Sequence, residues 1–173
     1  MALLELKDLH TFFRTKKGIV KAVNGVSYSV EAGRTLGVVG ESGSGKSVSA
    51  MSILQLLDGN GYIDSGEILF EGRDLTKLTE KEMYSVRGND ISVIFQEPMT
   101  SLNPVFTVSR QVSEPFIIHQ GMTKKQAAAK VIEMLADVKI PNPHIVAKQY
   151  PHQLSGGMRQ RVMIAMALAC KPK

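Results

Sequence analysis

The chain has 173 residues, 43% of them hydrophobic, a size that permits one α/β domain with a sizeable buried core. Its formal net charge is +5, but it has no long basic stripe and no basic residues interleaved with aromatics, so nucleic acid is not an expected partner. The single cysteine, Cys170, excludes an intrachain disulfide, and no apolar run or leader-like segment predicts a membrane span or secretion.

The N-terminal part alternates apolar and polar residues in the way that predicts β-strands. Leu4 and Leu6 alternate with charged residues, and three apolar residues in the segment 26–30 alternate with serines. After a Gly-rich break, Ile68 and Phe70 have the same spacing. We expect these strands to form a small antiparallel layer.

Residues 40–47 match the phosphate-binding pattern G-x-x-x-x-G-K-[ST] at every fixed position. Glycines in such a loop let the backbone curl, so that several N–H groups converge on phosphate oxygens. Lys46 is expected to reach the β- and γ-phosphates of a nucleoside triphosphate, and the hydroxyl of Ser47 is expected to bind Mg²⁺. The predicted nucleotide-binding residues are Gly40, Glu41, Ser42, Gly43, Ser44, Gly45, Lys46 and Ser47.

The sequence on either side of this loop predicts a strand before it and a helix after it. Residues 35–39 form a short apolar run of the buried-strand type. After the loop, Ala50, Ile53, Leu54 and Leu57 have the spacing of one helical face. A phosphate-binding loop requires this order of strand, loop and helix.

Two capping boxes predict the starts of two further helices. Thr79 with Glu82 predicts a short helix, and Thr123 with Gln126 predicts a longer one that ends before two nearby prolines. The apolar face of the longer helix comprises Val131, Met134, Leu135 and Val138.

Between these helices, the apolar residues 91–95 predict a second buried strand, and Gln96 follows it directly. In a phosphate-loop fold, polar side chains at the carboxyl ends of strands face the ligand. Polar residues also end strands without any such role, so a solvent-facing loop residue is the alternative for Gln96.

Residues 154–161, Leu-Ser-Gly-Gly-Met-Arg-Gln-Arg, predict the start of the final helix, which carries the apolar residues 162–170. Ser155 is placed to cap this helix, while Gly156 and Gly157 allow an anion to approach the backbone. The sequence therefore predicts a second site for a γ-phosphate, with an ordinary Ser-Gly-Gly helix start as the alternative.

The order and spacing of the phosphate loop, Gln96 and residues 154–161 resemble the nucleotide-binding subunit of an ATP-binding cassette (ABC) transporter. The resemblance covers essentially the whole chain. Residues 96–104, Gln-Glu-Pro-Met-Thr-Ser-Leu-Asn-Pro, and residues 150–155, Tyr-Pro-His-Gln-Leu-Ser, look like the bacterial dipeptide and oligopeptide importer branch, whose relatives also carry nickel.

This resemblance implies an α/β P-loop NTPase fold of the ABC ATPase type. It implies an N-terminal antiparallel β subdomain, part of a RecA-like parallel sheet and an α-helical subdomain with the signature motif. The expected partial nucleotide-binding domain divides into residues 1–97, which hold the β subdomain and P-loop core, and residues 98–173, which hold the helical subdomain.

The resemblance also implies how these residues handle ATP and Mg²⁺. Lys46 and Gln96 take catalytic roles, and Ser47 and Gln96 lie at the Mg²⁺ ion. An aromatic residue stacks on adenine in relatives, and Phe13, or else Phe12, is the candidate, with core burial as the alternative. The residues expected to contact ATP in trans, across a head-to-tail dimer, are Ser155, Gly156, Gly157 and Met158.

The implied partners are a second nucleotide-binding subunit, identical or different, two transmembrane permease subunits and, indirectly, an extracytoplasmic substrate-binding protein. The implied location is peripheral, at the cytoplasmic side of the cell membrane. The sequence does not specify the cargo, because the residues that contact the cargo lie in the permeases and in the external binding protein.

Relatives continue beyond this point into a strand that ends in Asp-Glu and on to a histidine, whereas this sequence ends at Lys173. The missing groups include the catalytic Glu and the switch His, so we expect negligible ATP hydrolysis from these 173 residues alone. We also expect the strands at 35–39 and 91–95 to lack parallel neighbours. The alternatives to an importer subunit are a catalytically silent, truncated ATP-binding form and a soluble ABC ATPase outside transport.

Overall fold

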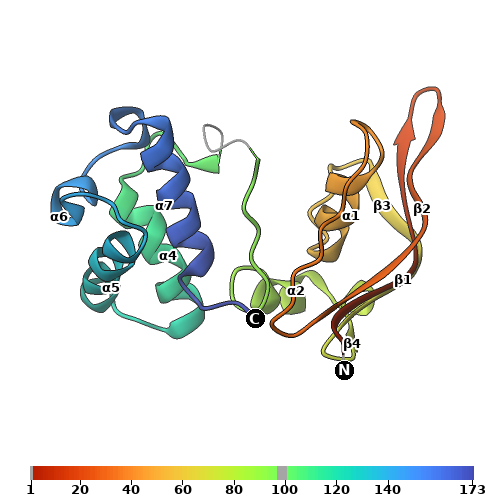
Figure 1. The fold of residues 1–173 in the computed structure, drawn as a ribbon, viewed down its shortest axis with the longest axis horizontal. Helices are drawn as coiled ribbons and strands as arrows, with labels where there is room; N and C mark the ends of the chain where they lie inside the picture. The colour runs from red at the N-terminus through yellow and green to blue at the C-terminus, as the bar shows by residue number, and fades with distance from the viewer. Residues whose placement is uncertain (1, 97–100) are drawn as a thin grey trace. The chain divides into compact units, whose positions relative to one another are not determined.

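The structure is a computed structural model that describes residues 2–96 and 101–173. The chain divides into two compact units, Met1–Tyr84 and Ser85–Lys173 (Figure 1). The first unit holds the β-sheet, and the second holds most of the helices. This boundary lies upstream of the one expected at residue 97, so residues 85–96 belong to the helical unit.

A four-stranded antiparallel sheet forms the first unit, as the sequence predicts. Its strands are β1 (Ala2–Thr15), β2 (Gly18–Glu31), β3 (Gly61–Phe70) and β4 (Arg73–Asp74), in the order β2-β1-β3-β4. The unit's most deeply buried apolar side chains are Leu6, Leu9, Ile68, Leu75 and Met83.

An irregularity in β1 changes which of its residues face the core. Asp8 has a positive φ of 46°, and the register of β1 shifts against both neighbouring strands between Leu6 and His10. Leu6 is buried before the shift, and Leu9 and Thr11 are buried after it. Such a bulge advances the alternation of side chains by one residue, which a simple period of two does not predict.

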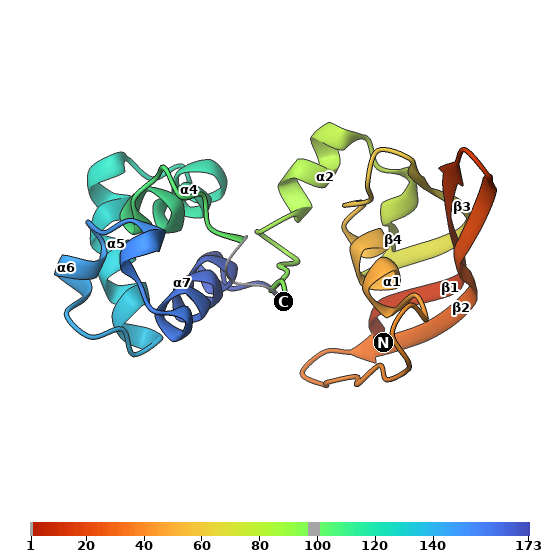
Figure 2. The ribbon, with the colours of Figure 1, turned by 90° about the horizontal axis from the view of Figure 1, so that it is seen from above.

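Helix α1 (Lys46–Ile53) packs on one face of this sheet (Figure 2). It begins directly after the phosphate loop, as predicted, but the predicted apolar face is wrong in part. Ala50 is exposed, whereas Ser49 and Ser52 are buried. Small side chains let the helix approach the sheet closely, and the hydroxyls of Ser52 and Thr11 lie 2.9 Å apart in a hydrogen bond.

The buried strand predicted at residues 35–39 is not formed. None of the described residues pairs with this segment as a strand, and Leu36, Val38 and Val39 are 44%, 50% and 93% exposed. A parallel strand needs hydrogen-bonding neighbours and cover on both faces, so an apolar run alone does not make one.

The strand predicted at residues 91–95 is likewise absent, apart from one parallel bridge between Arg87 and Ile91. Ile94 and Phe95 are 52% and 44% exposed. The expected partial parallel sheet is therefore not present in the described parts of the chain.

The second unit is a cluster of helices. It contains α4 (Val108–Gln120), α5 (Lys124–Asp137), α6 (Pro143–Val146), the 3₁₀ turn η2 (Pro151–Gln153) and α7 (Gly156–Leu168). The core between them comprises Leu102, Val108, Val112, Val131, Leu135, Ile140, Val146, Ala147, Leu154, Val162 and Ala165. The apolar face predicted for α5 is confirmed, since two of its four residues are fully buried and the other two are partly buried against this core.

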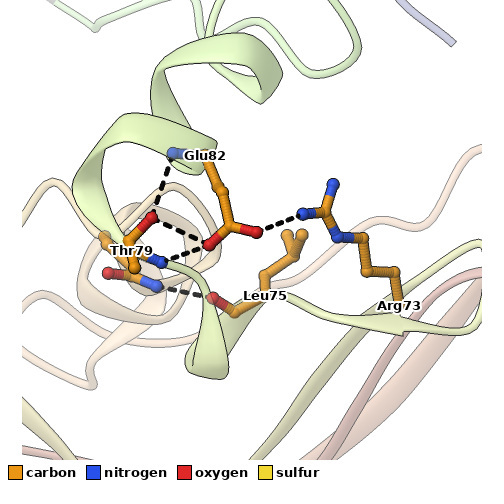
Figure 3. A network of polar contacts seen from close by, with 5 residues as sticks. Arg73, Leu75, Thr79 and Glu82 are labelled. Atoms are coloured by element: carbon orange, nitrogen blue, oxygen red, sulfur yellow. Dashed lines mark hydrogen bonds and ion pairs between the residues drawn. The ribbon is translucent and has the colours of Figure 1, made fainter.

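Both predicted capping boxes are present. Before α5, the hydroxyl of Thr123 accepts a bond from the N–H of Gln126, whose side chain accepts one from the Thr123 N–H at 2.9 Å. Thr79 and Glu82 make the same pair at the start of α2 (Glu80–Val86), after the 3₁₀ turn η1 (Leu75–Lys77) (Figure 3). These local signals therefore fix the starts of both helices.

Candidate functional site

Residues 40–47 curl into the N-terminus of α1. Gly43 and Gly45 have positive φ angles of 80° and 89°, in the left-handed region that favours glycine. The N–H of Ser44 donates to the carbonyl of Glu41 at 3.3 Å, which closes the turn. The first turn of α1 follows this loop directly, so its unpaired backbone N–H groups lie at the end of the curl.

Gly45 also lies against the sheet, which the loop pattern does not indicate. A Cβ atom on Gly45 would lie 2.3 Å from the carbonyl oxygen of Ala22 in β2. Gly43 has open space at the equivalent point. The glycine that precedes Lys46 is therefore required by both its φ angle and its contact with β2.

The side chain of Lys46 folds back over the loop. Its Nζ atom donates to the carbonyls of Gly40 at 2.7 Å and Glu41 at 2.6 Å, and to the hydroxyl of Ser44 at 3.1 Å. This places an ammonium group beside the curl. Phosphate oxygens accept stronger, charge-assisted bonds from such a group than carbonyls do, so the arrangement fits a polyphosphate.

Ser47 is exposed on the first turn of α1. A single hydroxyl beside a phosphate site fits Mg²⁺, which takes most of its ligands from phosphates and water. No group of three or more His, Cys, Asp or Glu residues within the described residues is placed to hold a metal ion. The Ser47 hydroxyl is thus the group of this loop that would hold a magnesium ion bound mainly by a nucleotide.

Phe12 and Phe13 project to opposite faces of the sheet. Phe12 is 7% exposed, and its ring packs edge-on against Tyr62 at 6.2 Å between centroids. Phe13 is only partly buried. Because side chains alternate along a strand, Phe13 lies on the same face of the sheet as Thr11, which contacts α1. Of the two aromatic candidates, Phe13 therefore shares a sheet face with the helix that follows the phosphate loop.

Gln96 lies exposed at the end of the extended segment that follows α2. It belongs to the helical unit, whereas Ser47 belongs to the sheet unit. Residues 97–100, which begin the predicted importer-type stretch after Gln96, lie outside the described residues.

Ser155 caps α7, as the sequence predicts. Its φ and ψ angles are −65° and 162°, and its hydroxyl accepts a bond from the N–H of Met158 at 3.3 Å. Gly156 and Gly157 are exposed, and Cβ atoms built on them would meet nothing within 4 Å. The N-terminus of α7 is thus open for an anion to approach its backbone within this unit.

Two arginines of the same motif hold the start of α7 in place. The Nε atom of Arg159 donates to the carbonyl of Leu154 at 3.1 Å, and Nη1 of Arg161 donates to the carbonyls of Val138 and Lys139 at 3.1 and 2.8 Å. The Arg161 bonds satisfy carbonyls at the C-terminus of α5, where a cation is also favoured by the helix dipole. The sequence motif alone does not indicate these two roles.

A groove between α4 and α5 is a further feature that the sequence did not indicate. Its volume is about 650 Å³, and Ile117 and Ile118 in its lining are 37% and 41% exposed. Its polar lining includes Arg110, Glu114 and Lys124. The lining therefore combines two exposed isoleucines with charges of both signs.

A family model described as ABC transporter matches residues 23–173. The chain belongs to the ABC transporter family. The resemblance inferred from the three motifs is therefore confirmed, and with it the P-loop ATPase fold class.

The ABC relatives with high identity are named for peptide transport. The chain is 52% identical over 172 residues to the oligopeptide transport ATP-binding protein OppD of Bacillus subtilis (strain 168), covering 99% of this chain and 48% of that protein. It is 51% identical over 170 residues to the dipeptide transport ATP-binding protein DppD of the same strain, covering 98% of this chain and 51% of that protein. The chain thus spans about half the length of these ABC relatives.

Solved ABC structures share the fold. The ATP-binding cassette MJ0796, in a dimeric post-hydrolysis state bound to ADP and Pi, matches with a TM-score of 0.85 and 29% identity, covering 98% of this chain and 70% of that one. Within the described residues of this ABC protein, no helix has both the length and the hydrophobicity to cross a bilayer.

Proposed function

We propose that this chain is the ATP-binding part of an energy-coupling subunit in a membrane importer of oligopeptides or dipeptides. The observation that carries the proposal is the curl of residues 40–47, with Lys46 folded over it at the start of α1. About 50% identity to proteins named for peptide transport supports the cargo class.

In this proposal, the backbone N–H groups of the curl and the N-terminus of α1 bind the phosphates of ATP. Lys46 exchanges the carbonyls of Gly40 and Glu41 for oxygens of the β- and γ-phosphates, because its bonds to the anion are stronger. Ser47 would hold Mg²⁺ through its hydroxyl. The ion would offset phosphate charge while the γ-phosphoryl group is transferred to water. Gln96 contacts the ion or the attacking water and senses the permease.

The proposed reaction needs a second subunit. Ser155, Gly156, Gly157 and Met158 of one subunit approach the γ-phosphate of ATP held by the other, in a head-to-tail dimer. The open N-terminus of α7 supports this role, because nothing within its own unit covers the two glycines. The related cassette MJ0796 is itself dimeric.

For the adenine base, we favour Phe13 as the stacking residue. Its ring is only partly buried and lies on the α1 face of the sheet, whereas Phe12 is committed to packing on the other face. Base–aromatic stacking contributes about 1–3 kcal/mol per base. Phe13 therefore adds affinity for the base to the phosphate contacts of the loop.

The membrane partner is proposed to be a pair of permease subunits that position this protein peripherally at the cytoplasmic side of the membrane. The groove between α4 and α5 fits a short amphipathic helix from such a permease, because its lining combines exposed isoleucines with charged side chains of both signs. ATP-driven closure of the dimer would then move the permeases, and an external binding protein would deliver the cargo.

Uptake of a labelled oligopeptide by cells that lack the gene tests this function. The wild-type, full-length gene product should restore uptake, and Lys46→Ala should reduce it at least tenfold, because the phosphate contacts of the ammonium are lost. Lys125→Ala, an exposed lysine of the helical unit, is the matched control and should restore uptake. Undiminished uptake with Lys46→Ala would contradict energy coupling, and restoration of nickel uptake alone would contradict the peptide cargo.

A further inference from the structure

Phe13 and Gly61 are direct partners across the antiparallel strands β1 and β3. Residues in such a pair project to the same face of the sheet. A Cβ atom on Gly61 would lie 2.7 Å from Cε1 and 3.1 Å from Cδ1 of the Phe13 ring. The ring therefore occupies the space that any side chain at position 61 would take.

The backbone on both strands is held around this pair. Asn60 binds Arg14 twice, since its carbonyl accepts from the Arg14 N–H at 2.9 Å and its Nδ2 donates to the Arg14 carbonyl at 3.0 Å. The N–H of Gly61 donates to the carbonyl of Asp58 at 2.7 Å. The position of Gly61 relative to the strand that carries Phe13 is thus fixed by hydrogen bonds.

Gly61 differs from the glycines that the fold itself requires. Its φ angle lies outside the left-handed region, so its backbone conformation is open to other residues. At Gly45 and Gly66, an added Cβ would lie 2.3 Å from a backbone carbonyl oxygen. At Gly61 it would meet two side chains, the Phe13 ring and Leu57, whose Cβ would be 3.1 Å away. A ring can turn aside where a strand backbone cannot.

We propose that Gly61 is a positioning residue for the base of the nucleotide. By leaving space over β3, it holds the Phe13 ring in the orientation in which the exposed part of the ring stacks on a purine. This inference rests on the proposed function, in which Phe13 is the stacking residue. In this role, Gly61 affects base binding through the Phe13 ring and not through the phosphate loop.

Gly61→Ala should displace the ring and weaken MgATP binding about fivefold or more, which is the lower range for a lost base–aromatic stack. Binding of inorganic tripolyphosphate with Mg²⁺ should not change, because that ligand has no base. Both affinities are measured by calorimetry on the full-length gene product, with thermal unfolding as a check on folding. Gly59→Ala is the matched control, since a Cβ there would meet nothing within 4 Å, and it should change neither affinity.

A double-mutant test separates this role from a general effect on the fold. In a Phe13→Leu background, which itself lowers MgATP affinity, Gly61→Ala should have no further effect. The positioning role is overturned if Gly61→Ala lowers the affinity for MgATP and for tripolyphosphate equally. It is also overturned if Gly61→Ala leaves the MgATP affinity unchanged while Phe13→Leu reduces it. Wild-type protein that binds neither ligand would overturn the proposed function and this inference with it, a result distinct from the other two.

Discussion

At the scale of single residues, Gly45 is subject to two independent constraints. Its φ angle of 89° disfavours other residues, and the carbonyl of Ala22 occupies the space of a Cβ atom. Gly43 shares the first constraint, with a φ angle of 80°, but not the second. The two glycines therefore provide a matched comparison within one loop.

Gly45→Ala should lower the free energy of unfolding by about 2–3 kcal/mol, because left-handed strain adds to the overlap with β2. Gly43→Ala should lower the free energy of unfolding by about 1 kcal/mol, because only the left-handed backbone strain applies there. Chemical denaturation of the full-length protein measures both. Equal losses for the two variants would contradict the contact between the loop and β2.

The sequence predicts some of these residues and not others, for a physical reason. Lys46 and the Ser155 cap follow from short motifs whose geometry is local. The pairing of Gly61 with Phe13 depends on the register across two strands, which a bulge at Asp8 interrupts. Register of this kind is set by non-local contacts, so the position of the Phe13 ring is visible only in the structure.

At the scale of elements, the start of α2 is held by charge as well as by backbone geometry. The N–H of Thr79 donates to Glu82 at 2.9 Å and its hydroxyl at 2.8 Å, and Arg73 from β4 donates to the other carboxylate oxygen at 3.0 Å (Figure 3). These bonds lower the pKa of Glu82 below its ordinary value of 4.5, and the bond from the Thr79 N–H has the largest effect. The carboxylate form thus favours the folded state.

The sign of the resulting pH dependence follows from this lowered pKa. Wild-type protein should be more stable than Glu82→Gln at neutral pH, because the amide keeps an acceptor for Thr79 but loses the charge. The difference should be complete above the ordinary pKa of 4.5 and should disappear as the pH falls through the lower folded value. Unfolding measured from neutral pH to about pH 3 tests this. A difference that stays constant across that range would contradict it.

The elements that the sequence mispredicts share one property. Residues 35–39 and 91–95 are apolar runs of strand length, but they contain exposed side chains and form no strand ladder with the described residues. An apolar composition therefore does not by itself provide a neighbouring strand to pair with. The helix starts at Thr79, Thr123 and Ser155 are correct, because a cap is complete within four residues. The caps, which are local, were thus predicted correctly, whereas apolar composition alone did not predict where strands form.

At the scale of the whole molecule, the ABC family assignment connects motifs that the structure describes in separate units. The phosphate loop lies in the sheet unit, whereas Gln96 and the Ser155 cap lie in the helical unit. In the proposed dimer, a complete site takes its loop from one subunit and its α7 N-terminus from the other. The order of these motifs along the sequence was sufficient to predict the family, because that order is independent of how the units pack.

In the proposed function, the curl ending in Lys46 and Ser47 binds the phosphates of MgATP. Calorimetric titration of MgATP into the full-length protein and its Lys46→Ala variant tests it most directly, with Lys125→Ala as the control. Lys46→Ala should weaken binding by about tenfold or more, since the ammonium is proposed to contact two phosphates, while the control should keep wild-type affinity. Equal affinities in all three proteins would contradict it.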